Sequence, residues 1–126
     1  MSAAAARSHV SGFEVRTKVW IERDGAVVIS DFLAELLEAV AEHGSVAAAA
    51  DALDLPYRTA WKKLREMETA AGVPLVESTS GGRDGGQTRL SDAATSIIEA
   101  LHRISDPATT LAQERFDAEQ DALPST

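Results

Sequence analysis

The sequence predicts a mainly α-helical fold with small β elements, and three observations point to this class. Residues 45–65 carry two apolar stripes of helical period that are separated by a tight turn. A third such stripe precedes them over residues 30–43, and two strand-like segments around a glycine-rich tip follow over residues 75–90. Three helices followed by a two-stranded ribbon make a winged helix-turn-helix. We predict this fold, with an N-terminal β-hairpin and a C-terminal dimerisation helix.

The N-terminal part predicts a flexible segment and then a hairpin. Residues 1–12 are small and polar, which is typical of frayed chain ends. Over residues 13–21 apolar and polar side chains alternate, as they do in a half-buried strand. Asp24-Gly25 is a two-residue hairpin signal, and the expected return strand is Ala26–Ile29.

The next predicted element is an amphipathic helix that begins after the N-cap Ser30 and ends at Gly44. Its apolar stripe consists of Leu33, Leu36, Leu37 and Val40. Its outer face is acidic and carries Glu35, Glu38 and Glu42. We expect this acidic surface to face away from any polyanion that the protein binds, because like charges repel.

The two helices of the helix-turn-helix are predicted from their stripes. The first has Ser45 as its N-cap and buries Val46, Ala49, Ala50 and Leu53. Asp54-Leu55 makes the turn, and Pro56 suits the first turn of the second helix, where a missing N–H costs nothing. The second helix buries Ala60, Leu64, Met67 and Ala71. Its other face carries Arg58, Lys62, Arg65 and Thr69 at the same spacing.

This cationic face favours contact with DNA. A recognition helix turns its N-terminal residues towards base edges in the major groove, so the candidate readers are Tyr57, Arg58, Thr59 and Lys62. Lys63 and Arg65 are expected to contact phosphates. Ser45 is a candidate phosphate contact at its helix start and also a good cap for that helix, and the two roles are compatible. Two other interpretations stay open: the face is merely solvated, or Arg58 pairs with Asp54. Trp61 is interpreted as a packing residue.

Residues 75–90 predict the wing, with strands at Leu75–Ser78 and Thr88–Leu90. At its glycine-rich tip Arg83 is a candidate contact to the minor groove or to a phosphate. Arg89, nearer the helices, is a candidate phosphate contact. The tip is not a nucleotide-binding loop, because no lysine followed by Ser or Thr closes it.

A fourth helix is predicted to open at Ser91-Asp92, and Asp106-Pro107 is expected to break or restart it. Its apolar stripe is larger than a lone terminal helix needs, which predicts a homodimer. The candidate dimerisation residues are Ile97, Ile98, Leu101 and Ile104. The expected division of the chain is a flexible segment at 1–12, a DNA-binding domain at 13–105 and an acidic tail, in part helical, at 106–126.

Composition excludes several other classes. The net charge of −8 is unusual for a DNA-binding protein, but the charge is unevenly distributed. Residues 31–54 carry six acidic and no basic side chains, whereas residues 55–90 carry six basic and four acidic ones.

Cysteine is absent, which excludes disulfides and thiolate sites. The three histidines have no metal-ligand spacing, and no pair of carboxylates stands out, so we expect no metal, no cofactor and no enzyme. No apolar stretch approaches a membrane span, and a cytoplasmic protein is expected.

Several motifs resemble the N-terminal DNA-binding domain of ModE-type, molybdate-responsive regulators, and especially their stand-alone members, which are similar to the DNA-binding part of LysR-type regulators. The resemblance covers roughly residues 16–104 and rests on Lys18–Gly25, Gly44–Ala50, Pro56–Trp61, Pro74–Glu77 and Gly81–Gly86 followed by Leu90. It implies a prokaryotic homodimer with one recognition helix per half-site and with wings on the flanking groove or backbone.

The sequence also departs from this family at three points. Pro56 stands where Ser or Thr is common, which puts a side-chain cap or phosphate contact in doubt, and Gln87 stands where another glycine is common. The chain ends without the C-terminal oxyanion-binding modules, so molybdate sensing does not follow from the resemblance.

The function predicted from the sequence is therefore a homodimeric transcriptional regulator that binds double-stranded DNA, with a separate effector-sensing protein as a further candidate partner. The alternative is a winged-helix module that binds a basic protein through its acidic surfaces.

Overall fold

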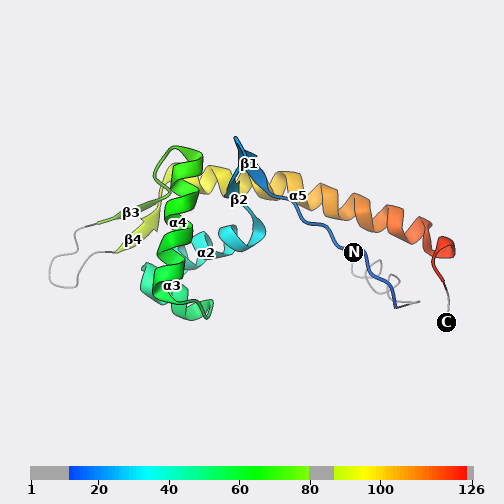
Figure 1. The fold of residues 1–126 in the computed structure, drawn as a ribbon, viewed down its shortest axis with the longest axis horizontal. Helices are drawn as coiled ribbons and strands as arrows, with labels where there is room; N and C mark the ends of the chain where they lie inside the picture. The colour runs from blue at the N-terminus through cyan, green and yellow to red at the C-terminus, as the bar shows by residue number, and fades with distance from the viewer. Residues whose placement is uncertain (1–11, 80–86, 125–126) are drawn as a thin grey trace. The chain divides into compact units, whose positions relative to one another are not determined.

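The computed structural model describes residues 12–79 and 87–124. It is mainly helical with two small hairpins, which confirms the predicted fold class (Figure 1). The elements follow the order β1 (Ile21–Arg23), β2 (Ala26–Ile29), α2 (Asp31–His43), α3 (Val46–Ala52), α4 (Tyr57–Ala71), β3 (Val76–Ser78), β4 (Thr88–Leu90), α5 (Asp92–Ala118) and the 3₁₀ turn η2 (Gln120–Ala122). The flexible segment predicted at 1–12, apart from Gly12, and most of the wing tip lie outside the described residues.

The chain divides into two compact units. The first is Trp20–Leu101, which holds both hairpins, the helix-turn-helix and the first part of α5. The second combines the segment before Trp20 with the chain from His102 onward. The predicted boundary between a domain at 13–105 and a tail at 106–126 remains a prediction.

The first hairpin is shorter than its sequence pattern indicates. Asp24 and Gly25 have φ values of 53° and 85°, the positive pair that a type I′ turn requires, as the two-residue hairpin signal predicted. The strand expected over residues 13–21 is wrong for most of its length, because residues 12–20 pair with no strand of the described chain. The reason is the length of β2, which ends at Ile29 before the cap of α2 and offers a ladder only to Ile21–Arg23.

Helix α2 begins and ends, and α3 begins, as their predicted caps indicated. Ser30 Oγ accepts a hydrogen bond from the Leu33 amide at 3.3 Å, and Ser45 Oγ accepts one from the Ala48 amide at 3.0 Å. Gly44 closes α2 in the left-handed conformation, with φ of 80°. These helices pack with α4, β2 and α5 around one core. Its largest fully buried side chains are Ile29, Leu36, Leu37, Val40, Leu64, Met67, Leu75 and Leu101.

The C-terminus of α4 is fixed by an arginine from the first hairpin. Arg23 Nη1 donates to the Ala71 carbonyl at 2.9 Å, where a cation also interacts favourably with the helix dipole. Gly72 then ends the helix with φ of 78°. A Cβ at Gly72 would lie 3.0 Å from Arg23 Nη1, so this position combines a required left-handed backbone with a close approach.

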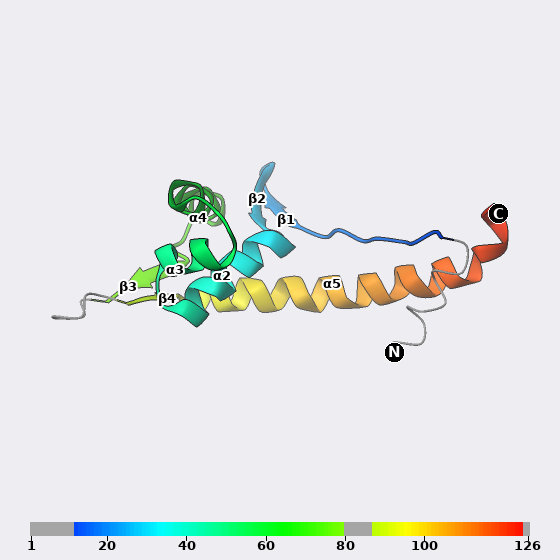
Figure 2. The ribbon, with the colours of Figure 1, turned by 90° about the horizontal axis from the view of Figure 1, so that it is seen from below.

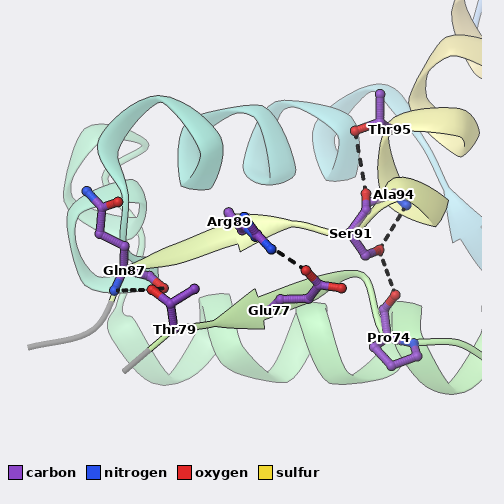
Figure 3. Close-up of polar contacts among 8 residues, drawn as sticks. All are labelled: Pro74, Glu77, Thr79, Gln87, Arg89, Ser91, Ala94 and Thr95. Atoms are coloured by element: carbon purple, nitrogen blue, oxygen red, sulfur yellow. Dashed lines mark hydrogen bonds and ion pairs between the residues drawn. The ribbon is translucent and has the colours of Figure 1, made fainter. Parts of the chain in front are cut away.

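Ser91 connects the base of the wing to α5 (Figure 3). Its hydroxyl donates to the Pro74 carbonyl at 2.8 Å and accepts from the Ala94 amide at 3.1 Å, which makes it the N-cap of α5. Its amide donates to the Leu75 carbonyl, and its side chain is buried. One serine therefore fixes the end of β4, the start of β3 and the first turn of α5.

Ser91→Ala is expected to lower the free energy of unfolding by about 1–2 kcal/mol, because a cap is lost and the Pro74 carbonyl loses its donor. Urea denaturation followed by far-UV circular dichroism measures this change. Ser96→Ala, an exposed serine on the same helix, is the matched control and should stay within about 0.5 kcal/mol of the unchanged protein. Equal losses in both variants would contradict the role of Ser91.

Helix α5 runs through Pro107, so the predicted break at Asp106-Pro107 is wrong. Proline removes one backbone hydrogen bond, here the one that the Arg103 carbonyl would accept. Both Pro107 and Arg103 are exposed, so water can satisfy that carbonyl and the helix continues.

The described residues of the second unit form no buried core. None of its described residues, 12–19 and 102–124, is buried. The Thr17 and Thr109 hydroxyls share a hydrogen bond of 2.9 Å, while Ile104 and Leu111 on α5 keep exposed fractions of 51% and 50%. Most of the stability of a helix in a protein comes from packing, so this half of α5 presents apolar surface that is not yet covered.

Candidate nucleic-acid interface

The two helices of the predicted helix-turn-helix pack against each other across a four-residue turn (Figures 1 and 2). The Leu55 amide donates to the Ala50 carbonyl at 2.8 Å and closes the turn. Asp54 adopts the left-handed conformation with φ of 57°, which aspartate tolerates better than most residues. Small side chains on α3, where Ala49 and Ala50 are buried, allow α4 to approach closely.

Helix α4 has one face in the core and the other in solvent. Ala60, Leu64 and Met67 are buried as predicted, whereas the fourth buried position is Ala70 and not the predicted Ala71, which is half-buried. The exposed side chains on the opposite side are Arg58, Lys62, Arg65 and Thr69, as their spacing predicted. We call Arg58, Lys62 and Arg65 the cationic face. Because their helix is anchored through its other side, the three cations are presented together on a rigid element.

Arg58 does not pair with Asp54, the alternative that the sequence left open. Within residues 12–79 and 87–124, neither Arg58 nor Lys62 makes a hydrogen bond or an ion pair. The two side chains are therefore available to an external partner. Thr59, half-buried in the first turn, lies next to them in sequence.

One flank of α4 carries an ordered set of side chains. The rings of Tyr57 and Trp61 meet edge to face with centroids 6.5 Å apart, and Tyr57 is 54% exposed. The Arg65 guanidinium lies 4.7 Å from the Trp61 ring centroid. Trp61 is thus half-buried and in contact with its own helix, in agreement with its interpretation as a packing residue.

Lys63 lies on the other flank of α4, away from the cationic face. Its Nζ is 5.7 Å from the ring centroid of Phe32 at the start of α2, and the residue is half-buried. Its predicted contact with a phosphate is not tested by this geometry. Lys63 thus differs from Lys62, which is exposed and lies on the cationic face.

The starts of α3 and α4 are capped differently. Ser45 caps α3 through its side chain, so the cap predicted for it is present, and its phosphate contact stays a prediction. Pro56 occupies the N-cap of α4 rather than its first turn and provides no side-chain hydrogen bond. The first amides of α4 therefore have no side-chain acceptor at the cap, as the departure at this position suggested.

The wing contributes one described cation. Arg89 Nε lies 3.4 Å from Glu77 Oε1 on the neighbouring strand, and both side chains are largely exposed (Figure 3). An exposed pair of this kind contributes little stability, so Arg89 can exchange Glu77 for a phosphate at small cost. Arg83, the predicted contact at the wing tip, lies outside the described residues.

The residues predicted for dimerisation fall into two groups. Leu101 is fully buried and Ile98 is 6% exposed, so both belong to the core of their own protomer. Ile97 is half-buried, and Ile104 is exposed. The predicted stripe was broad because it included both the core-facing and the solvent-facing sides of α5.

Two contacts that hold α4 in place were not predicted from the sequence. Glu68 on α4 accepts hydrogen bonds from the Leu75 and Val76 amides, and Arg23 fixes the end of the same helix. Both contacts join segments distant in sequence, and no local pattern signals them. The acidic outer face predicted for α2, by contrast, is present: Glu35, Glu38 and Glu42 are exposed, together with Asp31 at the same helical spacing.

Metal-site and membrane searches concern only the described parts of the chain. No group of three or more His, Asp or Glu side chains there could hold a metal ion. None of the helices there has the length and apolar character that crossing a bilayer requires.

The comparisons with known proteins agree with this geometry. The family model described as bacterial regulatory helix-turn-helix protein, lysR family, matches residues 33–95, from α2 to the start of α5. The chain is 38% identical over 78 residues to the molybdenum-pterin-binding protein MopA of Rhodobacter capsulatus, covering 62% of this chain and 29% of that protein.

Two ModE proteins are also similar. Identity is 37% over 83 residues to the molybdenum transport protein ModE of Azotobacter vinelandii, covering 66% of this chain and 30% of that protein. The identity is 31% over 91 residues to the DNA-binding transcriptional dual regulator ModE of Escherichia coli K12, covering 71% of this chain and 33% of that protein. The chain thus spans about a third or less of the length of these relatives. It contains a DNA-binding helix-turn-helix domain related to ModE transcriptional regulators, and it belongs to the lysR family of bacterial regulatory helix-turn-helix proteins.

Proposed function

We propose that this protein is a homodimeric transcriptional regulator that binds a roughly palindromic site in double-stranded DNA. The observation that carries the proposal is the cationic face of α4, three exposed cations on a helix whose other side is in the core. Arg58 and Lys62, near the N-terminal end of α4, read base edges together with Tyr57 and Thr59. Such a role places the protein with the DNA, in the cytoplasm of a prokaryotic cell.

Phosphate contacts supply most of the affinity in this proposal. Arg65 and Lys63 contact the backbone beside α4, Ser45 contacts it at the start of α3, and Arg89 with Arg83 contacts it from the wing. If a dimer neutralises about eight phosphates, the slope of log affinity against log salt concentration is about −7. The acidic face of α2 opposes non-specific contact and favours the orientation in which α4 meets the duplex.

The first test is fluorescence anisotropy with duplexes tiled upstream of the protein's own gene at several salt concentrations. We expect one tile to bind selectively and with the steep salt slope above. Arg58→Ala/Lys62→Ala should weaken this binding by at least about 30-fold, because every protomer loses two base contacts that each contribute about 1–3 kcal/mol of discrimination.

The matched control for this variant is Arg16→Ala/Arg103→Ala, which removes the same charge at exposed positions outside the helix-turn-helix. It should leave selective binding nearly unchanged. If both double variants weaken binding equally, net charge rather than the cationic face determines affinity. A salt slope near zero would also contradict the proposal.

A homodimer through α5 is part of the proposal. Ile104 and Leu111 are seven residues apart and about half exposed, on a helical segment that has no buried residue. Ile97 continues the same seven-residue spacing, which is typical of a helix that packs along a partner helix. Two copies would bury this stripe and present two α4 helices to two half-sites.

A second candidate function uses the acidic face of α2 to bind a basic protein. The four exposed carboxylates of that face, without a basic residue among them, favour it. An effector-sensing protein would be one such partner. The anisotropy experiment separates the candidates, because uniformly weak DNA binding with no effect of Arg58→Ala/Lys62→Ala favours the protein partner.

A further inference from the structure

A strip of four side chains runs along the flank of α4 at helical spacing: Tyr57, Trp61, Arg65 and Glu68. It begins at the N-terminal end of the recognition helix and ends where α4 meets the start of β3. Only Arg65 belongs both to this strip and to the cationic face. The contacts of Arg65 therefore determine how one cation of the face is presented.

Glu68 is the fixed end of the strip. Its Oε2 accepts hydrogen bonds from the Leu75 amide at 2.9 Å and from the Val76 amide at 3.3 Å, and its side chain is only 16% exposed. Two backbone donors thus hold the carboxylate in one orientation. In that orientation its other oxygen, Oε1, lies 3.4 Å from Arg65 Nη1.

Trp61 supports Arg65 from the other direction. The guanidinium carbon is 4.7 Å from the ring centroid, within the range of a cation–π contact. The Arg65 side chain nevertheless stays 69% exposed, so its donors remain open to solvent. Arg58 and Lys62, by contrast, have no hydrogen bond or ion pair to any described residue.

We propose that Trp61 is a positioning residue, which together with Glu68 orders Arg65 in the free protein for contact with a DNA phosphate. The inference rests on the proposed function, since it assigns how one phosphate contact of α4 is prepared. A planar guanidinium bonds phosphate oxygens in a fixed geometry, so orientation matters more for arginine than for lysine. Ordering a long side chain during binding lowers the affinity by about 2- to 10-fold. Because Trp61 and Glu68 already order Arg65 in the free protein, DNA binding avoids this loss.

Three variants at Trp61 and Arg65 test this role in DNA binding. Trp61→Leu keeps an apolar side chain but has no ring face, and we expect it to weaken binding by about 2- to 10-fold. Trp61→Phe keeps a ring face and should retain most of the affinity. In an Arg65→Ala background, Trp61→Leu should have an effect within about 2-fold of none, because the residue that it positions is gone.

Lys62→Ala is the control background, since Lys62 lies on the same helix but has no hydrogen bond, ion pair or cation–π contact with the Trp61 ring. Trp61→Leu should cost the same there as in the unchanged protein. Equal costs in all three backgrounds, including Arg65→Ala, would overturn the inference, because Trp61 would then act independently of Arg65.

A second readout needs no DNA. Protons of the Arg65 side chain should show an upfield ring-current shift in NMR spectra of the free protein, retained in Trp61→Phe and lost in Trp61→Leu. Thermal melting identifies any variant that fails to fold. If Trp61→Leu fails, Trp61→Phe takes its place in the double-mutant cycle with Arg65→Ala. An absent ring-current shift in the unchanged protein refutes the ordering itself. Loss of the effect of Arg58→Ala/Lys62→Ala refutes instead the proposed function.

Discussion

Leu101→Glu is expected to unfold the unit Trp20–Leu101. Leu101 is fully buried on α5 beside a core that also contains Leu37 and Leu75. Truncation of a buried leucine to alanine typically costs about 2–5 kcal/mol, and an unpaired carboxylate adds the cost of burying a charge. A small domain has only about 5–15 kcal/mol of stability, so the variant loses most or all of it. Far-UV circular dichroism and urea denaturation measure the loss.

Ile104→Glu is the matched comparison, with the same charge introduced one helical turn further along α5. Its side chain is exposed, so the unit Trp20–Leu101 should stay folded with its unfolding transition near that of the unchanged protein. A folded Leu101→Glu variant would show that α5 does not seal this core. It would also restore Leu101 to the dimerisation role that the sequence predicted for it.

The elements that the sequence predicted well are those specified by local chemistry. The caps Ser30 and Ser45 and the terminator Gly44 fix the boundaries of α2 and α3 within a few residues, because each satisfies the backbone groups next to it. The turn at Asp24-Gly25 is equally local. The exposed cations of α4 followed directly from helical spacing, since one anchored face leaves the other to solvent.

The errors concern features that depend on distant residues. The alternation over residues 13–21 is that of a strand, but a strand exists only where a partner supplies a ladder, and β2 is too short to do so. Similarly, a proline normally ends a helix because it cannot donate a hydrogen bond to the carbonyl four residues earlier. Helix α5 continues through Pro107, because Arg103, whose carbonyl lacks this donor, is exposed and water can bond to it.

The candidate site shows the same division. Spacing identified Arg58, Lys62 and Arg65 on one face. Glu68, which accepts a hydrogen bond from Arg65, is itself held by amides seven and eight residues away, just before and at the start of β3. Likewise, the sequence could not show which apolar residues of α5 face the core and which face solvent. Ile98 and Ile104 are equally apolar and differ only in what packs against them.

Ile104→Glu/Leu111→Glu is expected to give folded monomers with much weaker DNA binding. Both side chains are about half exposed in the protomer, so the core is not disturbed, but two carboxylates would repel their counterparts across a dimer interface. Linking two half-site contacts raises affinity by about 10²- to 10⁴-fold, and a monomer loses that gain. With about half the phosphate contacts, its salt slope falls to about −3.5. Sedimentation velocity and fluorescence anisotropy measure the two effects.

Thr110→Glu separates self-association from simple charge repulsion. Thr110 is exposed and adjacent to Leu111 but lies about 100° away around the helix, off the apolar stripe. Thr110→Glu adds one negative charge, as each substitution of Ile104→Glu/Leu111→Glu does. A loss of DNA affinity caused by charge alone would therefore appear in Thr110→Glu as well. We expect Thr110→Glu to remain dimeric and to bind DNA nearly as the unchanged protein does. A double variant that stays dimeric in sedimentation would exclude the Ile104 and Leu111 stripe as the interface, whatever its effect on DNA binding.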